Sequence, residues 1–76
     1  MSIAYAMPKA GPVRLEVYNL TGQRVRTLFD GQASAGMNSV RWDARGENGR
    51  KLSAGAYFVT LKAGERLSTK KVVLFH

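Results

Sequence analysis

The sequence predicts an all-β protein, a small sandwich of about seven antiparallel strands in two sheets. Three observations carry this prediction. Apolar and polar residues alternate in short runs, which is the pattern of half-buried strands. Residues that favour turns, above all the eight glycines, separate the runs. No long stretch repeats its apolar residues at the 3.6-residue period of an amphipathic helix.

The first two strands are expected at residues 3–7 and 13–18. The three large apolar residues of the first run share one face, and Pro8 ends the run because its nitrogen has no hydrogen to donate to a neighbouring strand. In the second run Val13, Leu15 and Val17 alternate with polar residues, which makes it the clearest half-buried strand of the chain.

The third strand is expected at residues 23–29, after a tight turn. Val25 and Leu28 lie three positions apart, so strict alternation would place them on opposite faces. We therefore expect a one-residue bulge between them. Arg24 and Arg26 are expected to share one solvated side of this strand.

The fourth strand, at residues 38–42, places Val40 and Trp42 on its inner face, and a long turn follows at residues 43–51. Trp42 could stack on a sugar ring, but an inward tryptophan is more often part of a core, and we assign it a structural role. We expect one shared core made of Leu15, Val17, Val40, Trp42, Tyr57 and Leu61.

The fifth strand begins at a glycine that precedes a tyrosine by two residues. Gly55 can adopt backbone angles closed to residues with a Cβ, and Tyr57 can bury its ring while its hydroxyl reaches back to the preceding loop. Both residues are therefore predicted to be structural. The last strand, at residues 67–75, is expected to be interrupted at Lys70–Lys71.

Residues 1–76 are predicted to form one domain, with room for a scaffold and hardly for a deep active site. The chain has no cysteine and no apolar run long enough to span a membrane, and its first residues do not show the charged and apolar regions expected of a signal peptide. If the domain is exported, we expect it to be a piece of a larger secreted precursor.

Nothing in the composition points to an enzyme or to a cofactor. The only histidine is His76, the last residue, so catalysis by a triad of serine, histidine and aspartate is effectively excluded. The five acidic residues lie singly in strands and turns, and no glycine-rich loop precedes a helix. Asp43 and Asn48 could offer oxygens to calcium, but closing turns through their own backbone is their expected role, and no metal site is predicted.

Twelve lysines and arginines against five acidic residues give a formal net charge of +7, which raises the question of anionic partners. Interleaved aromatic residues in a row are missing, so no specific nucleic-acid binding is expected. The residues that could form a basic stripe are Arg14, Arg24, Arg26, Arg41, Arg45, Arg50, Lys70 and Lys71.

An ordered series of short motifs makes the chain recognisable. The motifs are Ile3-Ala4-Tyr5 with Met7-Pro8, Val13 to Asn19, Gly22-Gln23 with Val25 and Leu28, Gly36 with Val40 to Asp43, Gly49, Leu52, Gly55, Tyr57-Phe58, Leu61, Gly64 and Thr69 to Leu74. In order and spacing the series resembles the C-terminal sorting domain of proteins exported by the type IX secretion system. That group is similar to the immunoglobulin-like domain of the flagellar hook-capping protein.

This resemblance implies an immunoglobulin-like sandwich at the end of a larger passenger, which it directs through the outer-membrane secretion machinery to the cell surface or the medium. The sorting region of that family maps onto the last strand, namely Thr69, Lys70, Lys71, Val72, Val73 and Leu74. Two roles are possible for Lys70 and Lys71: direct recognition by the secretion machinery, or ordinary protection of a sheet edge against aggregation. Family members often have glycine at position 44 and aspartate or asparagine at 46, whereas this chain has Ala44 and Gly46.

A second hypothesis is an accessory binding module of an extracellular enzyme, for carbohydrate or another surface ligand. An anionic surface polysaccharide would suit the positive charge in either case.

Overall fold

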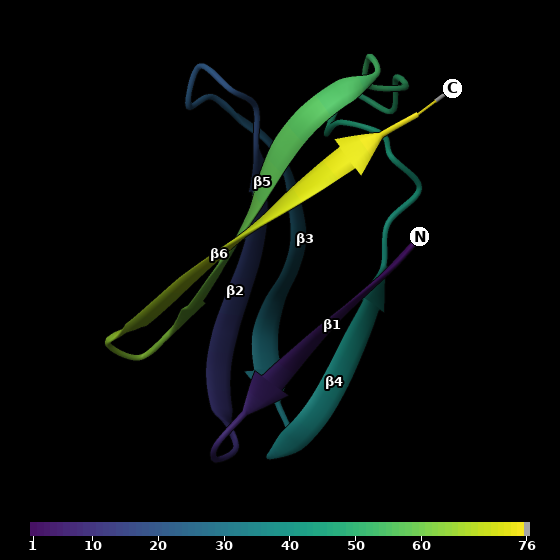
Figure 1. Cartoon of the computed structure of the whole chain (residues 1–76). Coiled ribbons are helices and arrows are strands. Elements are labelled where there is room, and N and C mark those ends of the chain that lie inside the picture. Colours follow the sequence, from purple (N-terminus) through teal and green to yellow (C-terminus); the bar gives the residue numbers. More distant parts are fainter. Residues whose placement is uncertain (76) are drawn as a thin grey trace.

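The computed structural model describes residues 1–75, and His76 lies outside the described residues (Figure 1). The described part contains six strands where the sequence suggested about seven. All pairings are antiparallel. The strands are β1 (Ser2–Met7), β2 (Gly11–Tyr18), β3 (Arg24–Ala33), β4 (Gly36–Arg41), β5 (Gly55–Ala63) and β6 (Arg66–Leu74).

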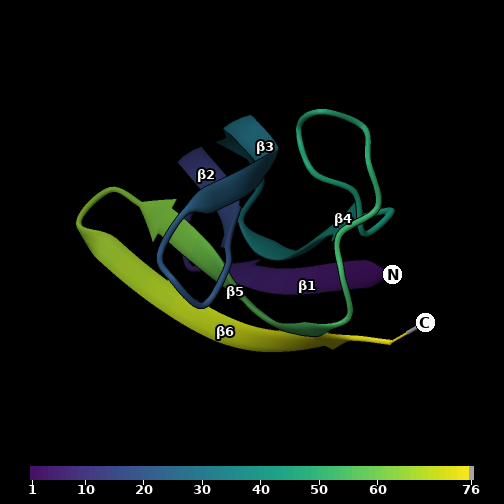
Figure 2. The same ribbon diagram turned by 90° about the horizontal axis from the view of Figure 1, so that it is seen from above.

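The strands form two unequal sheets. One has the order β3-β2-β5-β6, and the other consists of β1 and β4 alone. The chain therefore changes sheet after β1, after β3 and after β4, as a sandwich requires. Seen from above, β1 lies between β4 and β6 (Figure 2). Because the smaller sheet consists of β1 and β4 alone, it does not fully cover β6, and a groove remains between β6 and β1.

The core lies between the sheets, around Trp42 at 1% exposure. Its ring packs edge-on against Tyr57, with ring centroids 6.3 Å apart. Of the expected core, Val40 and Leu61 are only half-buried and pack against its rim. The main buried cluster is Ile3, Leu15, Val17, Trp42, Tyr57, Val59 and Leu74, and a second, smaller one is Met7, Val13 and Ala33.

Strand β3 contains two irregularities where one bulge was expected. Its register against β2 shifts once between Leu15 and Glu16 and again between Val17 and Tyr18, so that Leu28 and Val25 have no direct partner on β2. Because of the second shift, the prediction that Arg24 and Arg26 share one side of the strand is wrong. Arg24 pairs with Tyr18 on the outer face, whereas Arg26 pairs with Val17 and turns to the opposite side.

Hydrogen bonds connect the long turn after β4 to β3. Arg26 donates from Nη1 to the Arg45 carbonyl oxygen at 2.9 Å, the Glu47 N–H donates to the Val25 carbonyl at 2.9 Å, and the Thr27 N–H donates to Glu47 Oε1 at 2.6 Å. Asp43 and Asn48 close local turns, as predicted, by accepting from backbone N–H groups two residues on.

The expected corner at the start of β5 is confirmed. Gly55 has a φ of 142°, which L-residues rarely adopt, and the Tyr57 hydroxyl donates to the Ser53 carbonyl at 2.8 Å. One expectation at the other end of the sheet is wrong. Lys70 and Lys71 do not interrupt the last strand, since β6 runs unbroken from Arg66 to Leu74 and pairs with β5 throughout.

Candidate sorting strand and adjoining groove

Strand β6 is an edge strand whose first six residues, 66–71, are all exposed. Its other end is anchored, because Leu74 is buried in the core and Val72 is half-buried against it. The strand therefore combines a fixed C-terminal end with a long accessible portion. Five of the six residues predicted as the sorting strand are at least partly accessible, and only Leu74 belongs to the core.

The two faces of β6 differ in what they adjoin. Lys70 pairs with the buried Val59, so Arg66, Ser68 and Lys70 face the interior side of the sheet. Lys71 pairs with Phe58 and belongs to the outer face. The adjacent lysines of the sequence thus point to opposite sides.

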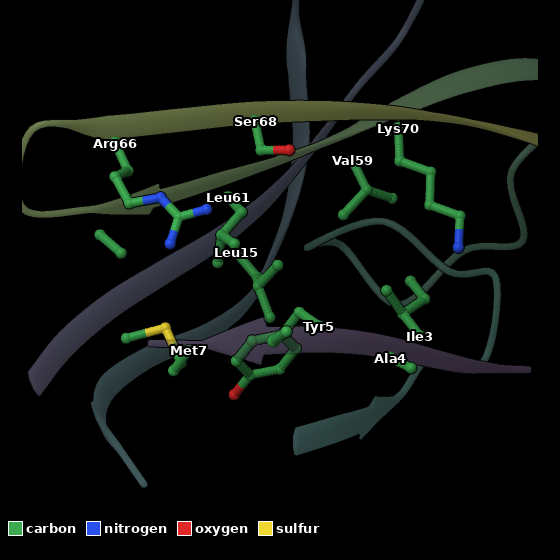
Figure 3. A pocket seen from close by; sticks show the side chains of 12 residues that line it. Ile3, Ala4, Tyr5, Met7, Leu15, Val59, Leu61, Arg66, Ser68 and Lys70 are labelled. Atoms are coloured by element: carbon green, nitrogen blue, oxygen red, sulfur yellow. The ribbon is translucent and has the colours of Figure 1, made fainter. Parts of the chain in front are cut away.

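A groove of about 250 Å³ separates β6 from β1 (Figure 3). Its floor is apolar and comes from Leu15 on β2 and from Val59 and Leu61 on β5. The β6 rim carries Arg66, Ser68 and Lys70. Every residue of β1 from Ile3 to Met7 lines the opposite side.

The outer face of the larger sheet carries a row of two aromatic residues between two cations. Arg24 pairs with Tyr18, Tyr18 with Phe58, and Phe58 with Lys71, which places the four residues side by side across all four strands. Both aromatic residues are half-buried. The sequence does not suggest this row, because its members lie far apart along the chain and only strand pairing aligns them.

Next to this row Glu16 is buried, at 2% exposure, although its position alternates outward. Arg24 Nη1 lies 3.0 Å from Glu16 Oε2, Lys62 Nζ lies 3.9 Å from Oε1, and the Tyr18 hydroxyl donates to Oε1 at 3.3 Å. Burial alone would raise the pKa of Glu16, but the Arg24 hydrogen bond and the nearby positive charges lower it below 4.5, its ordinary value.

Trp42, Gly55 and Tyr57, which were assigned structural roles, lie in the core or at the corner that leads into β5. Trp42 is buried and its Nε1–H donates to the Arg45 carbonyl at 3.1 Å, so its ring is not available to stack on a sugar. Gly55 and Tyr57 form the corner. Within residues 1–75 no group of three or more acidic, histidine or cysteine residues is placed to hold a metal ion, and no helix is long and apolar enough to cross a membrane.

Two antiparallel sheets, a core tryptophan between them and a tyrosine corner define a small immunoglobulin-like β-sandwich. A family model, described as the FlgD Ig-like domain, matches residues 1–66. The chain belongs to that family. Comparison with curated proteins and with solved structures gave no match. The match ends at the first residue of β6, so nearly all of the candidate sorting strand lies beyond the matched residues.

Proposed function

We propose that this domain is a non-catalytic module that directs a larger passenger through the type IX secretion system and holds it at the cell surface. The observation that carries the proposal is the form of β6, a last strand that is anchored at Leu74 and exposed on both faces over residues 66–71. A secretion receptor that reads the end of a folded domain needs an accessible strand of this kind.

Membership of the FlgD Ig-like domain family supports the scaffold. The sorting function rests on the resemblance of the ordered sequence motifs to sorting domains. The partners in this proposal are the outer-membrane secretion machinery and an upstream passenger domain. The protein acts in the medium or on the outer surface of the cell.

The test is export of a reporter protein that carries this chain at its C-terminus, in a bacterium with the type IX system. Removing residues 72–76 should abolish export. Because Val72 and Leu74 also pack against or within the core, circular dichroism of the purified truncated domain must show that it is folded.

A second variant avoids this complication. Lys70→Glu with Lys71→Glu reverses two exposed charges on β6, and Arg50→Glu with Lys51→Glu makes the same charge change in an exposed turn. We expect the first pair to reduce export at least tenfold and the second to leave it unchanged. A folded truncated domain that is exported normally, or equal effects of the two pairs, would contradict a sorting role for β6.

The row of Arg24, Tyr18, Phe58 and Lys71 favours a second candidate, an accessory module that binds an anionic polysaccharide. Aromatic rings with flanking cations suit a ring-shaped, negatively charged sugar. Deleting the domain from its passenger separates the two functions. Loss of export supports sorting, whereas normal export with weaker attachment to purified surface polysaccharide supports the accessory role.

A further inference from the structure

The groove beside β1 has a feature that goes beyond the sorting proposal. It is lined by five consecutive residues of β1, from Ile3 to Met7, whereas β5 and β6 contribute only every second residue. Side chains of a strand alternate between its faces, so a cavity that touches consecutive residues runs along the backbone edge of that strand. The groove therefore opens onto the main chain of β1.

This edge offers free hydrogen-bonding groups. Met1 and Trp42 exchange two backbone hydrogen bonds, each 2.8 Å long. Antiparallel pairs alternate, so the N–H and C=O groups of Ser2, Ala4 and Ala6 point away from β4. In the described part of the chain no strand pairs with this side of β1.

The edge of β1 also lacks the protection found at the other edges. Segment Ser2–Met7 has neither a charged residue nor a proline. By contrast, β6 carries Lys70 and Lys71, β3 is bulged and is hydrogen-bonded by the turn after β4, and β4 contacts β3. An apolar, unprotected edge beside an apolar groove is the arrangement that accepts an added strand.

The charges at the groove specify the occupant. Figure 3 shows Arg66, Ser68 and Lys70 extending from β6 toward β1. Neither Arg66 nor Lys70 forms an ion pair within residues 1–75. They lie four positions apart, about 13 Å along a strand, which is the spacing of positions i and i+4 of any extended peptide. With a net charge of +7, a second copy of the chain would be repelled.

We propose that the groove between β1 and β6 binds an extended acidic peptide, which adds as a third strand to the β1–β4 sheet. Its backbone pairs with Ala4 and Ala6. Two acidic side chains four residues apart face Arg66 and Lys70, and a small apolar residue between them covers Ser68 and the groove floor.

The first test uses a capped seven-residue peptide with threonine at its odd positions, glutamate at positions two and six, and valine at position four. Titrated into the full ¹⁵N-labelled chain, it should shift the amide signals of β1 and β6 in a saturable way. A peptide with lysine for both glutamates should bind at least tenfold more weakly. Equal binding of the two peptides, or shifts confined to other strands, would overturn the proposal.

The protein supplies a matched pair of variants. Lys70→Glu and Lys71→Glu make the same charge change on adjacent, exposed residues that face opposite sides of the sheet. We expect Lys70→Glu to weaken peptide binding about tenfold and Lys71→Glu to weaken it less than twofold. Equal losses would mean a general attraction of charge and would overturn the groove as the site.

The backbone pairing is tested on the peptide, which leaves the protein fold untouched. Methylating the amide nitrogens of the even positions gives one probe, and methylating those of the odd positions gives another. Only one set of N–H groups faces β1, so one probe should fail to bind and the other should bind as before. Equal binding of both probes would overturn strand addition. Sedimentation that shows a peptide-free dimer, disrupted by Ala4→Pro, would assign the groove to a second copy and overturn the acidic peptide.

Discussion

Ala44 is the one described residue other than glycine with a positive φ, at 63°. A Cβ in this left-handed conformation costs about 1–2 kcal/mol, which explains why glycine suits the position. Replacing Ala44 by glycine would relieve this strain. Glycine also makes the unfolded chain more flexible, which costs about 0.4–1 kcal/mol of stability and offsets part of the relieved strain.

Ala44→Gly is therefore expected to raise the free energy of unfolding by up to about 1 kcal/mol, measured by urea denaturation. Ala54→Gly is the matched control, because Ala54 is exposed and has no positive φ. This control should lower stability. Destabilisation of the same size by both substitutions would contradict strain at Ala44.

At the scale of the element, two glycines begin or join strands with different backbone requirements. Gly55 opens β5 with a φ of 142°, and Gly64 turns between β5 and β6 with a φ of 62°. A Cβ would meet nothing within 4 Å at either position, so only the backbone conformation distinguishes them.

Gly55→Ala should cost about 2–3 kcal/mol, and Gly64→Ala about 1 kcal/mol, because an angle near 60° is open to L-residues at moderate cost whereas one near 140° is nearly closed to them. Thermal melts of the two variants measure the difference. Equal, small losses would show that the corner at Gly55 relaxes without its glycine.

Glu16 links three strands electrostatically, through Arg24 on β3 and Lys62 on β5. Its pKa is lower in the folded state than the ordinary 4.5, so the folded state binds fewer protons at this site than the unfolded state does. The resulting stability is complete above about pH 4.5 and is lost as the pH falls through the folded-state value.

Glu16→Gln should lower the free energy of unfolding by about 1 kcal/mol at pH 7, because the charged partner of Arg24 is lost. The difference from the unchanged protein should disappear at low pH, where Glu16 itself is protonated. Urea denaturation at pH 7 and below pH 4 gives both values. A difference that is independent of pH would assign the effect to packing.

At the scale of the whole molecule, the net charge of +7 predicts weak binding to heparin or other polyanions. The basic residues occupy several strands and turns, so the attraction should not depend on sequence and should fall steeply with salt as counterions return. Binding measured by fluorescence anisotropy between 50 and 200 mM salt tests this. Tight binding to one oligonucleotide that persists at high salt would point to a specific nucleic-acid binder.

The fold class, the approximate positions of the six described strands and four residues of the buried core, Leu15, Val17, Trp42 and Tyr57, could be predicted from the sequence alone. These features follow from patterns that extend over only a few residues. Leu15 and Val17 show the alternation of a half-buried strand, and Gly55 and Tyr57 form the corner before β5. Tertiary structure alone decided which strands became edges. It placed Arg26 on the inner side of β3, buried Glu16 under side chains from two other strands, and left the edge of β1 open beside Arg66 and Lys70. The physical reason is that alternation fixes the face of a residue, whereas pairing between distant strands fixes what covers that face.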